Sequence, residues 1–231
     1  SEAGGSLLST RETPSWVSEA VAELAGYDDV LHLQRTTAFG SYDDGFVLAL
    51  ERRTDHLGAA APKNVLRQRV WRLRAGSVVV ATGAHERPIV FSDNDRPGIM
   101  LAGAARTYLN RYGALAGRQV VVFTTNDSAY AAALDLQAAG ATVTVVDARP
   151  SPAPAEGLTV LAGRVVTGTR GVERVTHALA GDEAIPCDLL LVSGGWNPAV
   201  HLVSQAGGRL RYDAALGAFV PAGLPAGMTV V

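Results

Sequence analysis

The chain has 231 residues, of which 48% are hydrophobic and 18% are charged, so we expect a packed globular protein rather than a disordered one. A formal net charge of −2 gives no electrostatic reason to expect nucleic-acid or anionic-membrane binding. No apolar run is long enough to span a bilayer, and the first residues lack a signal-peptide pattern. The single cysteine, Cys187, excludes an intrachain disulfide, and we expect a buried, unreactive thiol in a cytoplasmic protein.

The first half of the sequence predicts one helix followed by several strands. Apolar residues first recur at helical spacing, and two alternating apolar runs then flank Asp44–Gly45, a dipeptide typical of a hairpin turn. The predicted elements are, in order, a helix over 13–26, hairpin strands over 31–39 and 46–53, a loop over 54–64, a strand over 67–74 and a buried strand over 78–81.

A β-α-β unit is predicted from residue 117 onward, with Asp127 as the N-cap of its helix. We expect its two strands to be parallel, with a right-handed crossover between them. The predicted elements are a strand over 119–123, a helix over 128–139, a strand over 142–146, short strands over 158–180, a buried strand over 188–193 and a last strand over 228–231.

The buried strand over 78–81 runs directly into the small residues Ala81, Thr82 and Gly83. A strand that ends in small residues lets a loop backbone approach a ligand at the carboxyl edge of a sheet. Because Gly83 has no Cβ, its backbone is suited to lie against a pyrophosphate or an adenosine. The alternative is a plain strand-to-loop turn. The elements on both sides favour a cofactor loop.

Two glycine pairs are further candidates for cofactor contact. Gly4–Gly5 is typical of a loop that passes under a ribose and a flavin, and the alternative is a flexible start. Gly194–Gly195 permits a tight turn after the strand over 188–193, and Trp196 follows. A tryptophan here either covers a ligand or, more often, packs in the interior or against another subunit.

The loop after the strand over 119–123 departs from the G-x-G-x-x-G fingerprint of dinucleotide binding. Thr124 and Asn126 occupy the first two glycine positions, and Asp127 puts a negative charge where a pyrophosphate would sit. We therefore expect a capped structural turn without nicotinamide binding, and a solvated strand-end acid at Asp147, the position of a ribose-binding acid. No metal-site spacing and no nucleophile-base set is present, so neither a metal nor a catalytic residue is predicted.

Three segments carry a resemblance to a known family: ATGAHERPIVFSDNDRPG, TTNDSAYAAALDL and SGGWNPAV. Together they resemble the alpha subunit of heterotetrameric sarcosine oxidase, in its NAD-binding region similar to pyridine-nucleotide-disulfide reductases. The resemblance implies an α/β, FAD/NAD(P)-binding, two-dinucleotide-domain fold that is incomplete at the first βαβ unit. It assigns residues 1–114 and 193–231 to a first lobe, truncated at both ends, and residues 115–192 to an inserted second Rossmann-like lobe.

The family oxidises sarcosine to glycine with formation of hydrogen peroxide. The resemblance implies NAD in this region, FMN at the interface with the beta subunit, FAD in the beta subunit, and beta, gamma and delta subunits as partners. The region by itself is expected to be catalytically inactive and to self-associate. The cofactor-binding residues carried over from the family are Gly4, Gly5, Ala38, Ala81, Thr82, Gly83, Gly194 and Gly195, with Ala38 on the strand expected to meet an adenine.

Three alternatives stay open at this point. One is a structural and interaction module of a flavoenzyme complex that binds no nucleotide. Another is a subunit of a related opine or amino-acid dehydrogenase, a class that shares the ATGA-x-ERP segment. The third is a free-standing NAD(P)H reductase.

Overall fold

The computed structural model describes residues 3–12, 15–152 and 156–231, and the chain divides into two compact units. Unit 1 comprises Ser1–Ala3, Ser15–His85 and Asn197–Val231, and unit 2 comprises Gly4–Pro14 and Glu86–Trp196, in each case as far as they are described. Unit 2 thus extends beyond the predicted inserted lobe, because residues 86–114 pack with it. The lobes assigned by resemblance remain a prediction about domain organisation. The predicted helix start at residues 13–14 lies outside the described residues.

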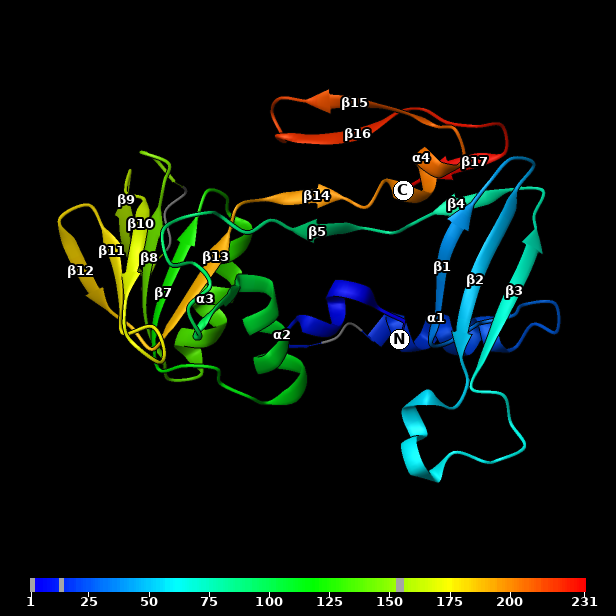
Figure 1. The fold of residues 1–231 in the computed structure, drawn as a ribbon, viewed down its shortest axis with the longest axis horizontal. Helices are drawn as coiled ribbons and strands as arrows, with labels where there is room; N and C mark the ends of the chain where they lie inside the picture. The colour runs from blue at the N-terminus through cyan, green and yellow to red at the C-terminus, as the bar shows by residue number, and fades with distance from the viewer. Residues whose placement is uncertain (1–2, 13–14, 153–155) are drawn as a thin grey trace. The chain divides into compact units, whose positions relative to one another are not determined.

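Unit 2 is built on a five-stranded sheet in which every neighbouring pair of strands is parallel (Figure 1). Its order is β6-β13-β7-β8-β9. The strands are β6 (Ile99–Leu101), β7 (Gln119–Thr124), β8 (Thr142–Asp147), β9 (Thr159–Ala162) and β13 (Leu189–Ser193). The predicted parallel pairing of the β-α-β strands is confirmed. The sheet is covered on both faces, which explains why its central strands read as continuous apolar runs.

Two helices cover one face of this sheet, α2 (Ala102–Tyr112) and α3 (Ser128–Ala138), and they enclose a core around Leu136 and Leu191. The other face packs against a three-stranded antiparallel sheet of β10 (Val166–Arg170), β11 (His177–Ala180) and β12 (Glu183–Pro186). Cys187 is buried in that second core, and burial raises the pKa of its thiol to about 11, as expected for an unreactive cysteine. No helix in the described part of the chain is long and apolar enough to cross a membrane.

Unit 1 contains a three-stranded antiparallel sheet with the predicted hairpin at its centre. Asp44 and Gly45 both have positive φ, and a Cβ on Gly45 would lie 2.1 Å from the Ala75 carbonyl oxygen, so only glycine fits there. The elements of unit 1 are α1 (Ser15–Ala25), β1 (Thr36–Ser41), β2 (Phe46–Arg52), η2 (Asp55–Ala60), β3 (Gln68–Arg74), β4 (Val78–Val80), α4 (His201–Gln205), β15 (Arg209–Asp213), β16 (Ala218–Gly223) and β17 (Met228–Val230).

Three short elements lie at the points where the chain passes between the units. The 3₁₀ helix η1 (Gly5–Ser9) begins unit 2, and β5 (Ala84–Glu86) pairs with β14 (Trp196–Pro198). In unit 1, β4 and β17 form a separate parallel pair. The segments that the sequence singled out, Gly4–Gly5, Ala81–Gly83 and Gly194–Gly195, all lie next to these elements.

Leu190 tests whether the parallel sheet supplies the stability of unit 2. This side chain is 0% exposed, so we expect Leu190→Ala to lower the free energy of unfolding by about 2–5 kcal/mol through lost burial and a residual cavity. Leu66→Ala makes the same chemical change at a side chain that is 73% exposed, and should cost less than about 0.5 kcal/mol. Urea unfolding measures both. Equal losses would contradict the assignment of the core.

Candidate functional site

Unit 2 contains a hollow of about 360 Å³ at the carboxyl ends of its parallel strands. Leu101, the last residue of β6, lines it together with residues that follow β13 and β7. Three lining residues each lie within three residues of a glycine predicted to contact a cofactor: Ser6, Glu86 and Trp196. The full lining is Ser6, Ser9, Glu86, Leu101, Gly103, Ala104, Arg106, Thr107, Ser128, Ala132 and Trp196. Such an edge is the usual ligand position in open α/β sheets.

Glu86 supplies the carboxylate of the hollow. Its Oε2 accepts a 2.8 Å hydrogen bond from the backbone N–H of Gly103, in the first turn of α2, where N–H groups lack intrahelical partners. A Cβ on Gly103 would lie 2.8 Å from that oxygen and 3.8 Å from Trp196 Cη2. Glycine at position 103 therefore allows both side chains to approach the helix. Among the described residues, no cation pairs with the Glu86 carboxylate.

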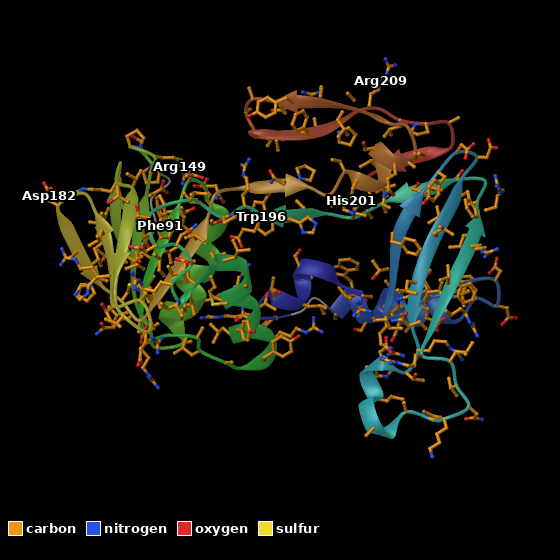
Figure 2. The ribbon with its side chains drawn as sticks, in the orientation of Figure 1. Phe91, Arg149, Asp182, Trp196, His201 and Arg209 are labelled. Atoms are coloured by element: carbon orange, nitrogen blue, oxygen red, sulfur yellow. The ribbon has the colours of Figure 1, made fainter. Side chains whose placement is uncertain are left out.

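Trp196 forms a flat wall of the hollow (Figure 2). Its side chain remains 42% exposed, and its indole Nε1 donates a 2.8 Å hydrogen bond to Ser128 Oγ. The Ser128 hydroxyl in turn donates to Asn126 Oδ1 at 2.5 Å. Sequence reasoning weighed Trp196 as a ligand cover or a packed residue but missed Ser128, which no motif marked. This chain of hydrogen bonds holds the indole ring in a defined orientation.

The Gly4–Gly5 segment reaches the hollow through η1, which is attached to α2. Ser9 Oγ and Thr107 Oγ1 lie 2.8 Å apart, and Asn110 Nδ2 donates to the Ser9 carbonyl at 2.8 Å. Gly4 and Gly5 both have positive φ, and a Cβ on Gly5 would meet no atom within 4 Å. The backbone at Gly5 is therefore open to a ligand.

Arg106 is the basic residue of the lining, and it is already paired. Its Nε lies 2.7 Å from Asp135 Oδ2, and Asp135 also accepts a hydrogen bond from Asn110. The pair joins α2 to α3 and neutralises the guanidinium. The hollow consequently presents a carboxylate without an opposing free cation among the described residues.

The predicted residues of unit 1 retain the geometry that a cofactor loop needs. Thr82 Oγ1 donates to the Ala199 carbonyl at 2.8 Å, and the Ala199 N–H donates to the Gly83 carbonyl at 2.9 Å. Gly83 has φ +65°, and a Cβ there would meet no atom within 4 Å. Ala81 and Ala38 are exposed, the latter opposite Ala49 at a β-bulge. The role of these residues in cofactor binding stays a prediction.

Gly194 and Gly195 are engaged by the protein itself. The Gly194 N–H donates to the Arg87 carbonyl at 2.7 Å, and the Arg87 N–H donates to the Gly195 carbonyl at 2.8 Å. A Cβ on Gly195 would lie 2.7 Å from Arg87 Nη2. The close passage of Arg87 is sufficient to explain both glycines, and their contact with a cofactor stays a prediction.

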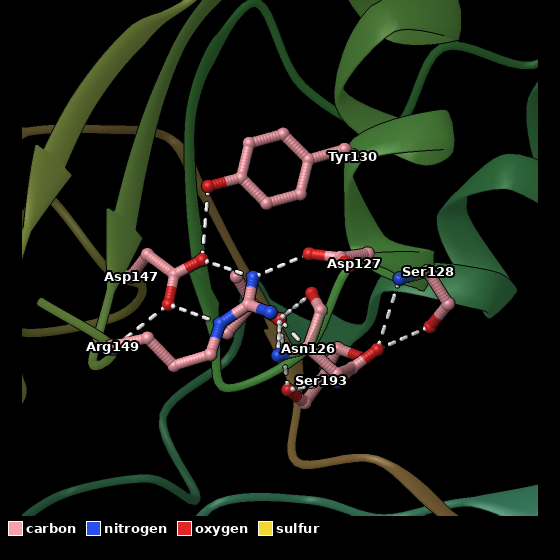
Figure 3. Close-up of polar contacts among 8 residues, drawn as sticks. Asn126, Asp127, Ser128, Tyr130, Asp147, Arg149 and Ser193 are labelled. Carbon is pink, nitrogen blue, oxygen red and sulfur yellow. Dashed lines mark hydrogen bonds and ion pairs between the residues drawn. The ribbon is translucent and has the colours of Figure 1, made fainter. Parts of the chain in front are cut away.

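The β-α-β loop carries a network around Arg149 (Figure 3). Asp147, at the end of β8, is fully buried and accepts hydrogen bonds from Tyr130 at 2.9 Å and from Arg149 Nη2 at 2.8 Å. The same Arg149 nitrogen lies 2.6 Å from Asp127 Oδ1. The prediction of a solvated Asp147 is wrong, because Arg149 folds back and supplies the partner that makes burial of this carboxylate tolerable.

The backbone of this loop is occupied as well. The Asn126 N–H donates to Thr124 Oγ1, and the Ser128 N–H donates to Asn126 Oδ1, each at 3.1 Å. Asn126 therefore caps α3, and the prediction of Asp127 as the N-cap is wrong because its carboxylate pairs with Arg149 instead. The donors that a pyrophosphate would need are already used, so the residues of this loop do not fit a dinucleotide.

The network shifts two pKa values in opposite directions. Burial opposes ionisation of Asp147, but hydrogen bonds from Arg149 and Tyr130 outweigh it and lower the pKa of the carboxyl. Burial and the neighbouring Asp147 carboxylate raise the pKa of Tyr130 to about 12. At neutral pH, the cluster is thus a carboxylate, a guanidinium and a neutral phenol.

The stability of the chain should reflect this cluster in its pH dependence. Because the pKa of Asp147 in the folded chain is below its ordinary value of 3.8, the ionised carboxylate stabilises the fold above that value, and the effect is lost as the pH falls through the folded-state pKa. We expect Asp147→Asn to lower the unfolding free energy at pH 7 by about 3–5 kcal/mol, because it leaves Arg149 poorly paired. The deficit should shrink below about pH 4.

Urea unfolding at several pH values measures this difference. Asp182→Asn is the control, since it removes the same charge from an exposed position of unit 2. A deficit for Asp147→Asn that stays constant between neutral and acid pH would contradict the assignment.

The fold identifies the class of protein. Solved structures with this fold include L-proline dehydrogenase from P. horikoshii, with a TM-score of 0.71 and 22% identity over 98% of this chain and 43% of that chain. Another is an FAD-dependent pyridine nucleotide-disulphide oxidoreductase from Desulfovibrio vulgaris, with a TM-score of 0.57 and 17% identity over 78% of this chain and 47% of that one. The chain has the FAD/NAD(P)-binding, disulfide-reductase-like flavoprotein fold, as predicted.

Sequence comparison narrows the class to particular relatives. The chain is 48% identical to the alpha subunit of sarcosine oxidase from Corynebacterium sp. (strain P-1), over 95% of this chain and 25% of the relative. It is 46% identical to the same subunit from strain U-96, over 96% and 25%. An opine oxidase subunit from Agrobacterium tumefaciens (strain Ach5) is 29% identical, over 89% and 46%. No protein-family model matches the chain.

These matches confirm the resemblance to the alpha subunit of sarcosine oxidase. The chain spans about a quarter of the length of the sarcosine oxidase subunits that it matches. Nearly all of this chain is aligned, so the similarity includes both units and the hollow.

Proposed function

We propose that the chain is the dinucleotide-binding region of an oxidoreductase subunit equivalent to the alpha subunit of sarcosine oxidase. The observation that carries this proposal is 48% identity over 95% of the chain to such a subunit. In this proposal the complete enzyme demethylates sarcosine oxidatively to glycine and forms hydrogen peroxide. The region itself is not catalytic, which accords with the lack of a nucleophile-base set in its sequence.

NAD is the proposed ligand of this region. The open backbone at Gly5 and Gly83 supports it, because positive φ and free space at both positions let a nucleotide come close. A bound NAD supplies a nicotinamide ring capable of hydride transfer. The proposal extends, on the resemblance alone, to FMN at a beta-subunit interface, FAD in the beta subunit, gamma and delta partners, and a cytoplasmic location.

A second candidate function is that of a structural module, which the closed β-α-β loop favours for the inserted lobe. Arg149 bridges Asp147 and Asp127 where a nucleotide phosphate would sit, so this lobe is suited to support rather than to binding. The similarity to an opine oxidase subunit allows another amine substrate class for the complete enzyme.

A substitution at Gly83 tests whether the region binds NAD. In the complete subunit, we expect Gly83→Val to weaken NAD binding at least about tenfold, because the new side chain enters the open space at the loop. Gly140→Val is the matched control, since Gly140 also has positive φ and free space at its Cβ but lies in the turn after α3. Isothermal titration calorimetry measures both.

Equal effects of the two substitutions would count against a role for Gly83. A complete subunit that binds no NAD would support the structural module instead.

A further inference from the structure

The charges around the hollow favour a cationic ligand over an anionic one. Of the two charged lining residues, Arg106 is compensated by Asp135 at 2.7 Å, whereas Glu86 has one oxygen on the Gly103 N–H and no cationic partner among the described residues. A phosphate would meet the Glu86 carboxylate without a compensating cation. A positively charged group would instead gain an ion pair in a partly desolvated place.

The shape of the hollow favours a flat ring. The indole of Trp196 has its polar edge satisfied by Ser128, and 42% of the side chain remains exposed. An indole face binds cations and planar rings, and tryptophan is the most effective aromatic side chain for cations. A volume of about 360 Å³ suits one substituted ring rather than a whole dinucleotide.

We propose that this hollow binds a planar heteroaromatic ring that carries a positive charge, with Glu86 facing the charge and Trp196 forming the stacking wall. The inference rests on the proposed function, because oxidised nicotinamide is the ring of this class that NAD supplies. Reduced nicotinamide is neutral and gains no ion pair with Glu86. The hollow therefore selects the oxidised form of the dinucleotide over the reduced form.

The first test uses two probes that differ in charge, the 1-methylnicotinamide cation and neutral nicotinamide. Calorimetric titration of the 231-residue chain should show that Glu86→Gln weakens binding of the cation about tenfold and changes nicotinamide binding less than about twofold. A glutamine still offers an oxygen to the Gly103 N–H, so the variant should keep the fold, which circular dichroism checks. Glu183→Gln, on β12, is the control for loss of one negative charge and should bind as the wild type does.

The second readout is tryptophan fluorescence. The chain has three tryptophans, Trp16, Trp71 and Trp196, and stacking should quench the emission of Trp196. We expect the cation to quench the wild type and Trp16→Phe, and to lose most of this effect in Trp196→Phe. Quenching that persists in Trp196→Phe would overturn the stacking role.

Absence of cation binding to the wild type at about 10 mM would overturn the subsite, as would equal affinity in Glu86→Gln. Titration of the complete subunit with NAD⁺ and NADH separates the two proposals. If neither dinucleotide binds while the cation still binds through Glu86, the proposed function fails and the subsite stands. If both bind with an affinity ratio that Glu86→Gln leaves unchanged, the proposed function stands and the subsite is overturned.

Discussion

A parallel sheet buried on both faces ends in polar residues that water does not reach. Thr124, Asp147 and Ser193 stand at the carboxyl ends of three adjacent strands and are each 0% exposed. A buried polar group without a partner costs several times what one hydrogen bond contributes, so each of these must be satisfied within the protein. Asn126 serves Ser193 and Thr124, and Arg149 serves Asp147. This requirement closes the β-α-β loop on itself.

The closed loop and the open hollow are two outcomes at one edge of the same sheet. Around β8 the edge is occupied by the Arg149 network, whereas between β6 and β7 it remains open beside Glu86 and Trp196. Ser128 links the two regions, because its backbone N–H donates to the capping Asn126 side chain and its hydroxyl holds the indole. The elements that abolish one nucleotide site thus position a wall of the other.

The glycines of the chain divide in the same way. At Gly5 and Gly83 a Cβ would enter open space, so the missing side chain leaves room for something outside the chain. At Gly195 and Gly103 the space is filled, by Arg87 and by Glu86 respectively. Glycine-rich motifs read alike in a sequence, but the neighbouring backbone decides whether they admit a ligand or another part of the protein.

The sequence by itself determined the class of fold and the order of its elements, because apolar runs and glycine turns are local signals that survive in the parallel strands and in the Asp44–Gly45 hairpin. It also located two of the glycine segments that border the hollow, Gly4–Gly5 and Gly194–Gly195. It did not determine that Asp147 is buried, that Asn126 rather than Asp127 caps α3, or that Ser128 holds Trp196. Those facts depend on which side chain reaches a buried group first across the sheet edge, and such long-range pairing leaves no periodic pattern. Only the tertiary structure decides it.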